Sequence, residues 1–396
     1  MGELVALAME GGAAFLNALQ RVWDAGDAVL PVDPHAPVAH LDQVFAAVRP
    51  GAIIESDGRR RSLQGGVNTE EGDAVVIATS GTTGTAKGAV HTHTGVAAAA
   101  RITAQACGAG TGSGARWLAC LPLAHVGGFS VITRALIAGT DVEVSNGADA
   151  ERIDAAALAG ATHVSLVPTL LGRIDPTLWQ LILLGGSAIP AERPTNTVAT
   201  YGMTETFGGV VYDGRALDGV DVRIETDGAI ALRSPTLLRA YRGGALDGTN
   251  PVDSNGWYRT GDIGALGEDG VLRVAGRSDD LIISGGTNVW PHPVENVLRS
   301  DPTVADVAVA GRPDPEWGER VVAFVVAADP SSPPTLDRLR DRVKEQLPVA
   351  SAPKEIVLLD VLPRTALGKI ARHMLPAGGT STHDHTGTDG PPDAHR

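Results

Sequence analysis

Four short apolar runs in the first half of the chain each lead into a turn rich in Gly, Pro or Ser. The runs cover residues 74–79, 117–123, 163–167 and 181–184. The continuous apolar run 74–79 is typical of a strand that is buried on both faces of a sheet, and the other three are weaker versions of the same pattern. The Ala-rich segment 94–107, which follows the first run and its Gly-rich loop, has helical character. Short buried strands that alternate with helices predict an α/β domain, with the order strand, loop, helix at each step.

The chain is too long for one hydrophobic core, because 396 residues usually form two or three domains. Residues 1–70 also have an α/β pattern, whereas short alternating strands and turns begin near residue 220 and predict a small β-rich subdomain. A polar break at residues 276–280 could be a hinge. We therefore expect a large N-terminal domain over 1–276, which contains α/β sheets and the β-rich subdomain. A small mobile α+β domain should follow over 277–376.

The predicted C-terminal domain has strand and helix patterns of its own. Residues 307–310 and 321–326 have the apolar character of strands. One apolar helical stripe is formed by Leu336, Leu339, Val343 and Leu347. Thr335 suits the start of that helix. Residues 377–396 lack apolar periodicity, so we expect a disordered tail whose histidines form no dedicated metal site.

Charge and cysteine content exclude several classes of function. The net charge is -14, and the longest basic run is Arg59-Arg60-Arg61, which argues against nucleic-acid binding. Cys107 and Cys120 lie in apolar stretches without metal-type spacing, as expected for reduced core residues of a cytoplasmic protein. No apolar run approaches the roughly 18–20 residues that a membrane span needs, and we expect no signal peptide.

The loop at residues 80–88 (Ser-Gly-Thr-Thr-Gly-Thr-Ala-Lys-Gly) is the clearest sign of function. Gly lets the backbone wrap an anion, the hydroxyl and N–H groups are donors, and Lys87 adds a positive charge, so the loop suits a polyphosphate. A P-loop is excluded, because Ala86 stands where that motif has Gly and Gly88 stands where it has Ser or Thr. A flexible surface turn remains the alternative for the loop taken alone.

Five motifs occur in an order that resembles the adenylate-forming superfamily of acyl-CoA synthetases, luciferases and peptide-synthetase adenylation domains. They lie at residues 79–88, 201–206, 258–262, 276–286 and 363–369. Each motif alone would be weak evidence, whereas five in order are specific. The resemblance implies two steps with ATP, Mg²⁺ and coenzyme A. A carboxylate attacks the α-phosphate of Mg-ATP to give acyl-AMP and pyrophosphate, and a thiol, usually that of coenzyme A, then displaces AMP.

The resemblance also implies roles for single residues. Lys369 would place positive charge between the two anions that meet in the first step, although a surface lysine is the alternative. Thr204 would donate to phosphate and Glu205 would hold Mg²⁺, since hard cations prefer carboxylate oxygen. Asp262 would accept from the ribose hydroxyls, and Arg277 would also reach the ribose. The alternatives are a helix-capping Thr or Asp.

The resemblance also implies the remaining nucleotide contacts. Phosphate contacts are expected from Thr79, Ser80, Gly81, Thr82, Thr83, Gly84 and Lys87. The adenine pocket is expected to include Gly185, Gly186, Ser187, Tyr201, Gly202 and Met203. Gly202 would also face the acid. The alternative for the glycines is an ordinary turn.

The C-terminal domain of this superfamily rotates between the two steps. Asp279 matches the hinge position, and rotation would withdraw Lys369 and bring Gly285 and Gly286 towards the thiol channel. Asp279 could instead cap a helix or form a salt bridge.

The segment from residue 122 to 139 resembles the corresponding part of the o-succinylbenzoate–CoA ligases of menaquinone synthesis. His125 would lie near the reacting carboxylate, and Arg134 would pair with a second carboxylate that is costly to bury alone. A packed structural histidine and an arginine in an ion pair are the alternatives. The abbreviated N-terminal region is similar to that of short actinobacterial ligases, and a homodimer could cover the surface it leaves exposed.

Two other functions stay open at this point. One is the same chemistry on another fatty or aryl acid. The other is a nucleotide-binding protein without catalysis, against which the presence of Lys369, Glu205 and Asp262 argues.

Overall fold

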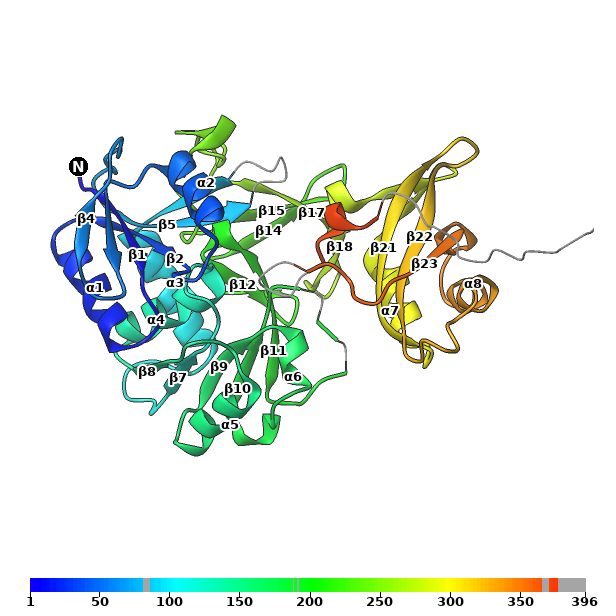
Figure 1. Cartoon of the computed structure of the whole chain (residues 1–396), viewed down its shortest axis with the longest axis horizontal. Helices are drawn as coiled ribbons and strands as arrows, with labels where there is room; N and C mark the ends of the chain where they lie inside the picture. The colour runs from blue at the N-terminus through cyan, green and yellow to red at the C-terminus, as the bar shows by residue number, and fades with distance from the viewer. Residues whose placement is uncertain (81–85, 188, 191, 365–369, 377–396) are drawn as a thin grey trace, which may run out of the picture. The chain divides into compact units, whose positions relative to one another are not determined.

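The computed structural model describes residues 1–80, 86–187, 189–190, 192–364 and 370–376 (Figure 1). Its described residues form two compact units, 1–278 and 279 onwards. Residues 277 and 278, which the sequence pattern placed in the C-terminal domain, therefore belong to the first unit. Both units mix helices and strands, so the expected α/β class is confirmed, and each unit is described below by itself.

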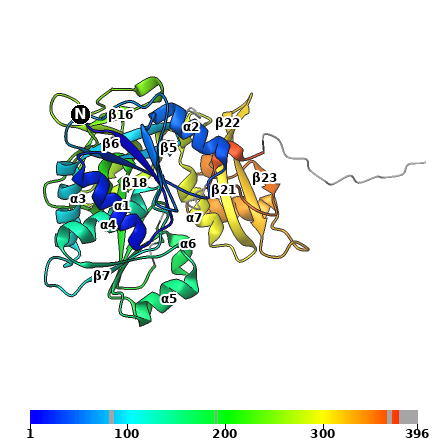
Figure 2. The same ribbon diagram turned by 60° about the vertical axis from the view of Figure 1, so that its left-hand side comes forward.

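The first sheet of unit 1 contains the N-terminal strands (Figure 2). In spatial order its strands are β16 (Ala240–Arg242), β6 (Ala86–Thr92), β5 (Asp73–Ser80), β2 (Ala28–Val32), β1 (Leu4–Ala8), β3 (Ala52–Glu55) and β4 (Arg60–Ser62). Helices α1 (Ala13–Asp24) and α2 (Val38–Val48) connect β1 to β2 and β2 to β3. All five residues of β2 are buried, as expected for a strand covered on both faces.

Strand β6 corrects the order strand, loop, helix that the sequence predicted for the phosphate loop. The chain returns along β5 as the antiparallel strand β6 before helix α3 (His93–Ala106) begins. The strand escapes prediction because Lys87, Gly88 and His91 interrupt its apolar pattern. Gly88 is required there, since a Cβ would lie 2.3 Å from a methyl group of Val76.

The second sheet of unit 1 places the ends of its parallel strands at one edge. In spatial order its strands are β13 (Arg215–Ala216), β12 (Gly208–Tyr212), β11 (Thr197–Met203), β10 (Leu181–Leu184), β9 (His163–Leu166), β7 (Arg116–Ala119) and β8 (Asp141–Val144). Strands β9, β10 and β11 are parallel neighbours, so the turns after β10 and β11 lie side by side. Ligands of open α/β sheets bind at such carboxyl ends.

Helices of this region fill the space beside the two sheets. They are α3, α4 (Val126–Ala138), α5 (Ala150–Leu158) and α6 (Pro168–Leu171). Val96 of α3 and Phe129 of α4 share one core with Ile77 of the first sheet and Trp117 of the second. This shared core fixes the two sheets and the site motifs at their ends relative to each other.

The predicted β-rich subdomain is a third, antiparallel sheet of unit 1. It consists of β14 (Asp221–Ile224), β15 (Ala229–Arg233), β17 (Tyr258–Leu266) and β18 (Leu272–Arg277). The register of β17 and β18 places Asp262 opposite Arg277. Two of the five motifs are thereby brought together by strand pairing.

Unit 2 is the expected small α+β unit. Its strands are β19 (Ile282–Ser284), β20 (Thr287–Val289), β21 (Val304–Asp314), β22 (Gly318–Ala327) and β23 (Glu355–Leu358), and its helices are α7 (Pro291–Arg299) and α8 (Leu336–Lys344). Thr335 caps α8 through its side chain, as predicted, because its hydroxyl accepts from the N–H of Arg338. The helix ends at Lys344, so Leu347 lies beyond it and still packs against the core of this unit.

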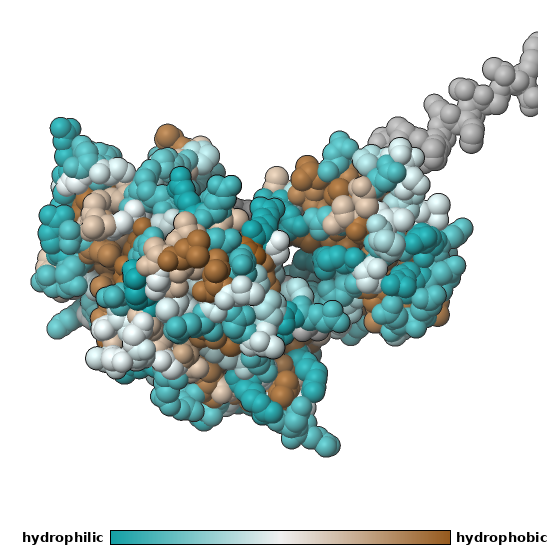
Figure 3. All heavy atoms as spheres, turned by 90° about the horizontal axis from the view of Figure 1, so that it is seen from below, coloured by the Kyte–Doolittle hydropathy of each residue, from teal (hydrophilic) through white to brown (hydrophobic). Residues whose placement is uncertain are grey.

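Figure 3 shows apolar side chains in small groups among polar ones on the face in view. Within the described ranges, no helix has the length and apolar character of a membrane span. Cys120 is buried and Cys107 partly buried, and both are free thiols. Burial raises the pKa of Cys107 to about 11 and that of Cys120 to about 12, so both stay protonated at neutral pH.

Candidate active site

The nucleotide motif at residues 201–206 is a tight turn at the end of β11. Strand β11 pairs with β12, and the register shifts between Tyr201 and Gly202. A Cβ on Gly202 would lie 2.0 Å from the carbonyl oxygen of Gly208, so only glycine fits this position. Thr206 fixes the turn, because its hydroxyl accepts from the N–H of Met203 at 2.9 Å. Thr204 and Glu205 are therefore held on a short 3₁₀ turn of defined shape.

The turn at Gly185, Gly186 and Ser187 lies beside that motif. The N–H of Gly185 donates to the carbonyl of Leu166 at 3.1 Å, and a Cβ there would lie 2.7 Å from Oγ1 of Thr200. Gly186 has φ of 85°, which favours glycine. The structure therefore brings the predicted adenine-pocket glycines and Tyr201 to neighbouring strand ends.

Asp262 is a nearly buried carboxylate that two predicted nucleotide residues contact. It is 9% exposed. The hydroxyl of Tyr201 donates to its Oδ2 at 2.8 Å, and Nη1 of Arg277 lies 3.6 Å from its Oδ1. Burial and the charge of Asp262 raise the pKa of Tyr201, so this phenol remains a donor. Tyr201, Asp262 and Arg277, predicted from three separate motifs, thus form one cluster.

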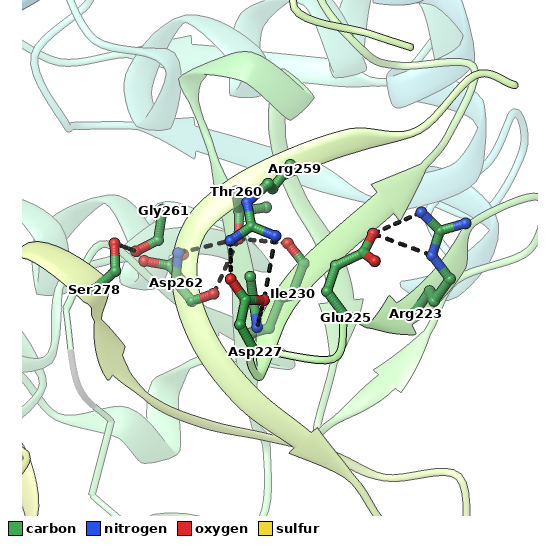
Figure 4. Close-up of polar contacts among 10 residues, drawn as sticks. Arg223, Glu225, Asp227, Ile230, Arg259, Thr260, Gly261, Asp262 and Ser278 are labelled. Atoms are coloured by element: carbon green, nitrogen blue, oxygen red, sulfur yellow. Dashed lines mark hydrogen bonds and ion pairs between the residues drawn. The ribbon is translucent and has the colours of Figure 1, made fainter. Parts of the chain in front are cut away.

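In the motif around Asp262, Thr260 supports the local fold, whereas Asp262 belongs to the cluster (Figure 4). Thr260 is buried, and its Oγ1 donates to the carbonyl of Ile230 and accepts from the N–H of Asp262. Arg259 instead pairs with Asp227, and both side chains are exposed. The β-strand alternation therefore directs Asp262 to the cluster and Arg259 to solvent.

Glu205 forms a second cluster with a lysine and a tyrosine. Its Oε1 lies 3.7 Å from Nζ of Lys87 and accepts from the hydroxyl of Tyr241 at 2.7 Å. The ammonium of Lys87 also lies 3.7 Å from the centre of the Tyr241 ring. Burial lowers the pKa of Lys87, and the neighbouring Glu205 opposes this shift. Sequence reasoning predicted Glu205 and Lys87 but missed Tyr241.

This second cluster fits a magnesium ion that arrives with ATP. Magnesium usually keeps several waters and takes one or two carboxylates together with phosphate oxygens. Glu205 offers such a carboxylate, with its side chain 13% exposed. In the part of the chain that the structure describes, no group of three or more His, Cys, Asp or Glu side chains forms a protein cage for a metal. One carboxylate beside a lysine suits Mg-ATP, because the carboxylate can take the metal and the lysine can take a phosphate oxygen.

His91 supports the turn that carries Thr204 and Glu205, and sequence reasoning did not predict it as part of the site. It is fully buried on β6, and its Nε2–H donates to the carbonyl of Thr204 at 2.8 Å. Its ring packs against Phe207 with centres 4.9 Å apart. Phe207 has φ of 53°, a conformation that costs free energy outside glycine. The neutral ring of His91 therefore helps to hold the turn that carries Thr204 and Glu205.

Burial also gives His91 a testable effect on stability, because it lowers the pKa of the ring to about 4. Unfolded, the ring titrates near 6.5, so between pH 6.5 and 4 the unfolded chain binds more protons and stability falls as pH falls. In His91→Gln the amide can still donate to the Thr204 carbonyl, but the side chain does not titrate. We expect the free energy of unfolding to fall by a few kcal/mol less between pH 7 and 4.5 in this variant than in the parent protein, at about 1.4 kcal/mol per pKa unit. Denaturant unfolding at both pH values measures this.

The exposed His40 provides the control for that experiment. The His40→Gln variant should keep the pH dependence of the parent protein. The same pH dependence in the parent and in His91→Gln would contradict a buried neutral His91.

The two residues that the sequence predicts to bind the acid, His125 and Arg134, lie at the start of helix α4 and within it. His125 is its N-cap residue, and its carbonyl accepts from the N–H groups of Gly128 and Phe129. Further along, Ser130 lies against Gly208, whose Cβ would be 3.7 Å from the Ser130 hydroxyl. Helix α4 therefore runs beside the strand that follows the nucleotide motif, with His125 at its start.

Arg134 lies nine residues after His125, or about 13 Å along the helix axis. It is 6% exposed, and its guanidinium carbon lies 4.4 Å from the ring centre of Trp117. Cys107 and Tyr212 are electrostatic neighbours. Its Nη1 is buried, and among the described residues it has no hydrogen-bond partner. The contacts of Arg134 with Trp117, Cys107 and Tyr212 thus join it to the core beside α4 rather than to His125, and its role towards the acid stays a prediction.

The other predicted residues are placed only in part. Thr79 on β5 donates through Oγ1 to the carbonyl of Lys87 at 3.4 Å, and Ser80 ends the strand. The loop residues Gly81, Thr82, Thr83 and Gly84, together with Lys369 and the predicted tail 377–396, lie outside the described residues.

The predicted hinge and thiol-channel residues belong to unit 2. Asp279 lies on a 3₁₀ turn at its start. Gly285 and Gly286 turn the chain between β19 and β20 with φ of 60° and 76°. The N–H of Gly285 donates to the carbonyl of Trp317 at 2.8 Å, and a Cβ on Gly285 would lie 2.8 Å from the Trp317 ring.

Comparison with known proteins shows which family the chain belongs to. Residues 64–232 match the AMP-binding enzyme family, and residues 293–369 match the AMP-binding enzyme C-terminal domain. A probable 2-succinylbenzoate–CoA ligase from Mycobacterium tuberculosis (strain H37Rv) is 38% identical over 388 residues, covering 92% of this chain and 94% of the relative.

Two solved structures of o-succinylbenzoate CoA synthetase (MenE) from Bacillus subtilis have the same fold. One is in complex with the acyl-adenylate intermediate OSB-AMP, with TM-score 0.82, 27% identity and coverage of 94% of this chain and 88% of that chain. The other is in complex with ATP and magnesium ion, with TM-score 0.80, 26% identity and coverage of 94% and 89%. The chain therefore belongs to the AMP-binding enzymes, and among them to the family of the 2-succinylbenzoate–CoA ligases.

Proposed function

We propose that this protein is a 2-succinylbenzoate–CoA ligase. It would join 2-succinylbenzoate to AMP with release of pyrophosphate, and then transfer the acyl group to coenzyme A with release of AMP. The observation that carries the proposal is the pair of clusters at neighbouring strand ends, Tyr201–Asp262–Arg277 and Lys87–Glu205–Tyr241. One suits a ribose and the other suits a magnesium-bound polyphosphate, which are two adjoining parts of ATP.

In the first step the residues of this chain would orient ATP and balance charge. Asp262 would accept hydrogen bonds from both ribose hydroxyls, and Tyr201 would hold this carboxylate in place. Lys87 would leave Glu205 for phosphate oxygen as ATP binds. Glu205 and the phosphates would hold Mg²⁺, which neutralises charge on the polyphosphate. Lys369 would supply positive charge where the carboxylate meets the α-phosphate.

In the second step unit 2 would rotate about the hinge at Asp279. The rotation would withdraw Lys369 and bring Gly285 and Gly286 to the path of the thiol. Nothing lies within 4 Å of the Cβ position of Gly286, so a slender chain such as pantetheine could pass along the backbone there. The thiol would lose its proton, its sulfur would attack the acyl carbon, and the bond between this carbon and the phosphate oxygen would break so that AMP leaves with its electrons.

The acid would enter beside α4, between His125 and the Gly202 turn. His125 would contact the reacting carboxylate. Arg134 would pair with the second carboxylate, and its buried Nη1 without a described partner supports this role. A dianionic acid would repay the cost of a buried guanidinium, whereas a neutral tail would not.

If Arg134 pairs with the acid, its substitution should change KM for the acid and leave KM for ATP nearly unchanged. We expect Arg134→Lys to raise KM for 2-succinylbenzoate about tenfold, because an ammonium cannot reproduce the planar guanidinium that lies over Trp117. KM for ATP should stay within about twofold. Steady-state kinetics with each substrate varied measures both values. An unchanged KM for the acid would remove Arg134 from the acid site.

A panel of acids tests the proposed function. Pyrophosphate release is measured with 2-succinylbenzoate, benzoate, a medium-chain fatty acid and a dicarboxylate without a ring. We expect turnover with 2-succinylbenzoate to exceed the others by at least about a hundredfold in kcat/KM, since a buried group without its partner costs several kcal/mol. Turnover only with another acid would contradict the substrate. ATP binding without turnover on any acid would favour a nucleotide-binding protein without catalysis.

Three further aspects of the proposal concern the setting of the enzyme. We place the reaction in the cytoplasm, where ATP and coenzyme A are available, and we expect small-molecule partners and no nucleic acid. The net charge of -14 supports the last point. A homodimer stays a prediction, which light scattering of the purified protein would test.

A further inference from the structure

Tyr241 contacts both charged residues of the second cluster, Lys87 and Glu205. Its hydroxyl donates to Oε1 of Glu205 at 2.7 Å, and its ring centre lies 3.7 Å from Nζ of Lys87. A second hydrogen bond joins its hydroxyl to that of Tyr258, 3.3 Å away. One side chain thus holds an anion at its tip and a cation over its face.

The fold fixes Tyr241 independently of any ligand. It is 5% exposed, and β16 pairs with β6 so that Tyr241 lies opposite Ala89, two residues after Lys87. The N–H of Leu238, three residues before Tyr241, donates to the carbonyl of Glu205 at 2.8 Å. The strand that carries Tyr241 is therefore tied to both the lysine strand and the Glu205 turn.

The distances explain what this arrangement achieves. A charge-assisted hydrogen bond between an ammonium and a carboxylate is normally about 2.7–2.9 Å long. Nζ of Lys87 stays 3.7 Å from Oε1 of Glu205, while the hydroxyl of Tyr241 occupies that oxygen. The two charges form an ion pair, but at 3.7 Å it is longer than a direct hydrogen bond of this kind. An ion pair kept at this distance is easier to open when phosphate and a metal arrive.

We propose that Tyr241 is a positioning residue for Mg-ATP, which keeps Glu205 available to the metal and Lys87 available to the phosphates. Its hydroxyl holds Oε1, so that Oε2 is left for the metal. Its ring holds the ammonium away from the carboxylate. The inference deepens the proposed function and rests on it only in that this site binds Mg-ATP.

Two substitutions separate the two ends of the side chain. Tyr241→Phe removes the hydroxyl and keeps the ring, whereas Tyr241→Leu removes both. Tyr212→Phe is the matched control, because Tyr212 is equally buried on β12 and its hydroxyl faces Thr103 at 3.5 Å, away from both clusters. Circular dichroism and thermal unfolding confirm that each variant is folded.

Calorimetric titration of ATP, with no acid present, gives a readout that does not depend on catalysis. It is done in excess EDTA and at several Mg²⁺ concentrations. We expect Tyr241→Phe to bind metal-free ATP within about twofold of the parent, and to lose about tenfold of the affinity gained from Mg²⁺, because the freed carboxylate closes onto Lys87. Tyr241→Leu should weaken ATP binding with and without Mg²⁺. The control should match the parent protein.

A double-mutant cycle with Glu205→Gln completes the test. If Tyr241 acts through Glu205, then adding Tyr241→Phe to Glu205→Gln should change the Mg²⁺-linked affinity by less than about twofold. Equal losses in EDTA and in Mg²⁺ for Tyr241→Phe, additive effects in the cycle, or the same loss in Tyr212→Phe would each overturn the inference. A parent protein that binds Mg-ATP yet activates no acid would overturn the proposed function and leave this inference standing.

Discussion

The Lys369→Ala variant is expected to lose acyl-adenylate formation while it still makes the thioester from supplied acyl-AMP. In the first step a carboxylate must approach a polyphosphate, and removing the positive charge between them should slow it by at least about a hundredfold. In the second step a neutral thioester forms as AMP leaves, and rotation of unit 2 would already have withdrawn Lys369. We therefore expect the second rate to change by no more than a few-fold.

The two half-reactions can be measured separately. Pyrophosphate release in the absence of coenzyme A reports the first, and thioester formation from synthetic 2-succinylbenzoyl-AMP reports the second. Lys344→Ala is the control, because this lysine lies in the last turn of α8 and pairs with Asp341. Equal loss of both half-reactions in Lys369→Ala would contradict the domain-rotation account.

The Asp262→Asn variant should have the second large effect, a loss of about a hundredfold or more in kcat/KM for ATP. A carboxylate can accept from both ribose hydroxyls, whereas an amide has one acceptor and turns a donor towards one of them. Hydrogen bonds to a charged group contribute about 1.5–3 kcal/mol each, so losing one such bond and burying an unmatched donor accounts for this size. The substitution also removes the carboxylate charge that lies 3.6 Å from Nη1 of Arg277.

Deoxy-ATP makes this prediction specific to the ribose. The parent protein should discriminate against 2′-deoxy-ATP or 3′-deoxy-ATP, and Asp262→Asn should lose most of that discrimination. Asp269→Asn, on an exposed turn of the same sheet, is the control and should keep it. If Asp262→Asn weakened ATP and both deoxy analogues by the same factor, then Asp262 would not contact the ribose.

The parts of the site that lie within continuous motifs could be predicted from the sequence. Gly202 and Glu205 belong to one run of residues, and the steric reason for the glycine, a carbonyl 2.0 Å from its Cβ position, is local to the β11–β12 turn. The cluster of Tyr201, Asp262 and Arg277 was also accessible, because each residue was predicted separately and strand pairing brings them together.

The missed residues depend on pairing between distant parts of the chain. Tyr241 reaches Glu205 only because β16 pairs with β6, a contact across about 150 residues that no local pattern encodes. His91 escaped for a related reason, since a histidine in a short strand has no signature until the carbonyl of Thr204 is placed above it. Strand β6 was overlooked because its small and polar residues hide the alternation that marks a strand.

The most direct test of the proposed reaction follows its two steps separately by mass spectrometry. The parent protein is incubated with 2-succinylbenzoate and Mg-ATP, first without and then with coenzyme A. We expect 2-succinylbenzoyl-AMP and pyrophosphate to form without coenzyme A. We expect added coenzyme A to convert the adenylate to the thioester with release of AMP. Formation of ADP and phosphate, or of a thioester with no preceding adenylate, would contradict the proposed reaction.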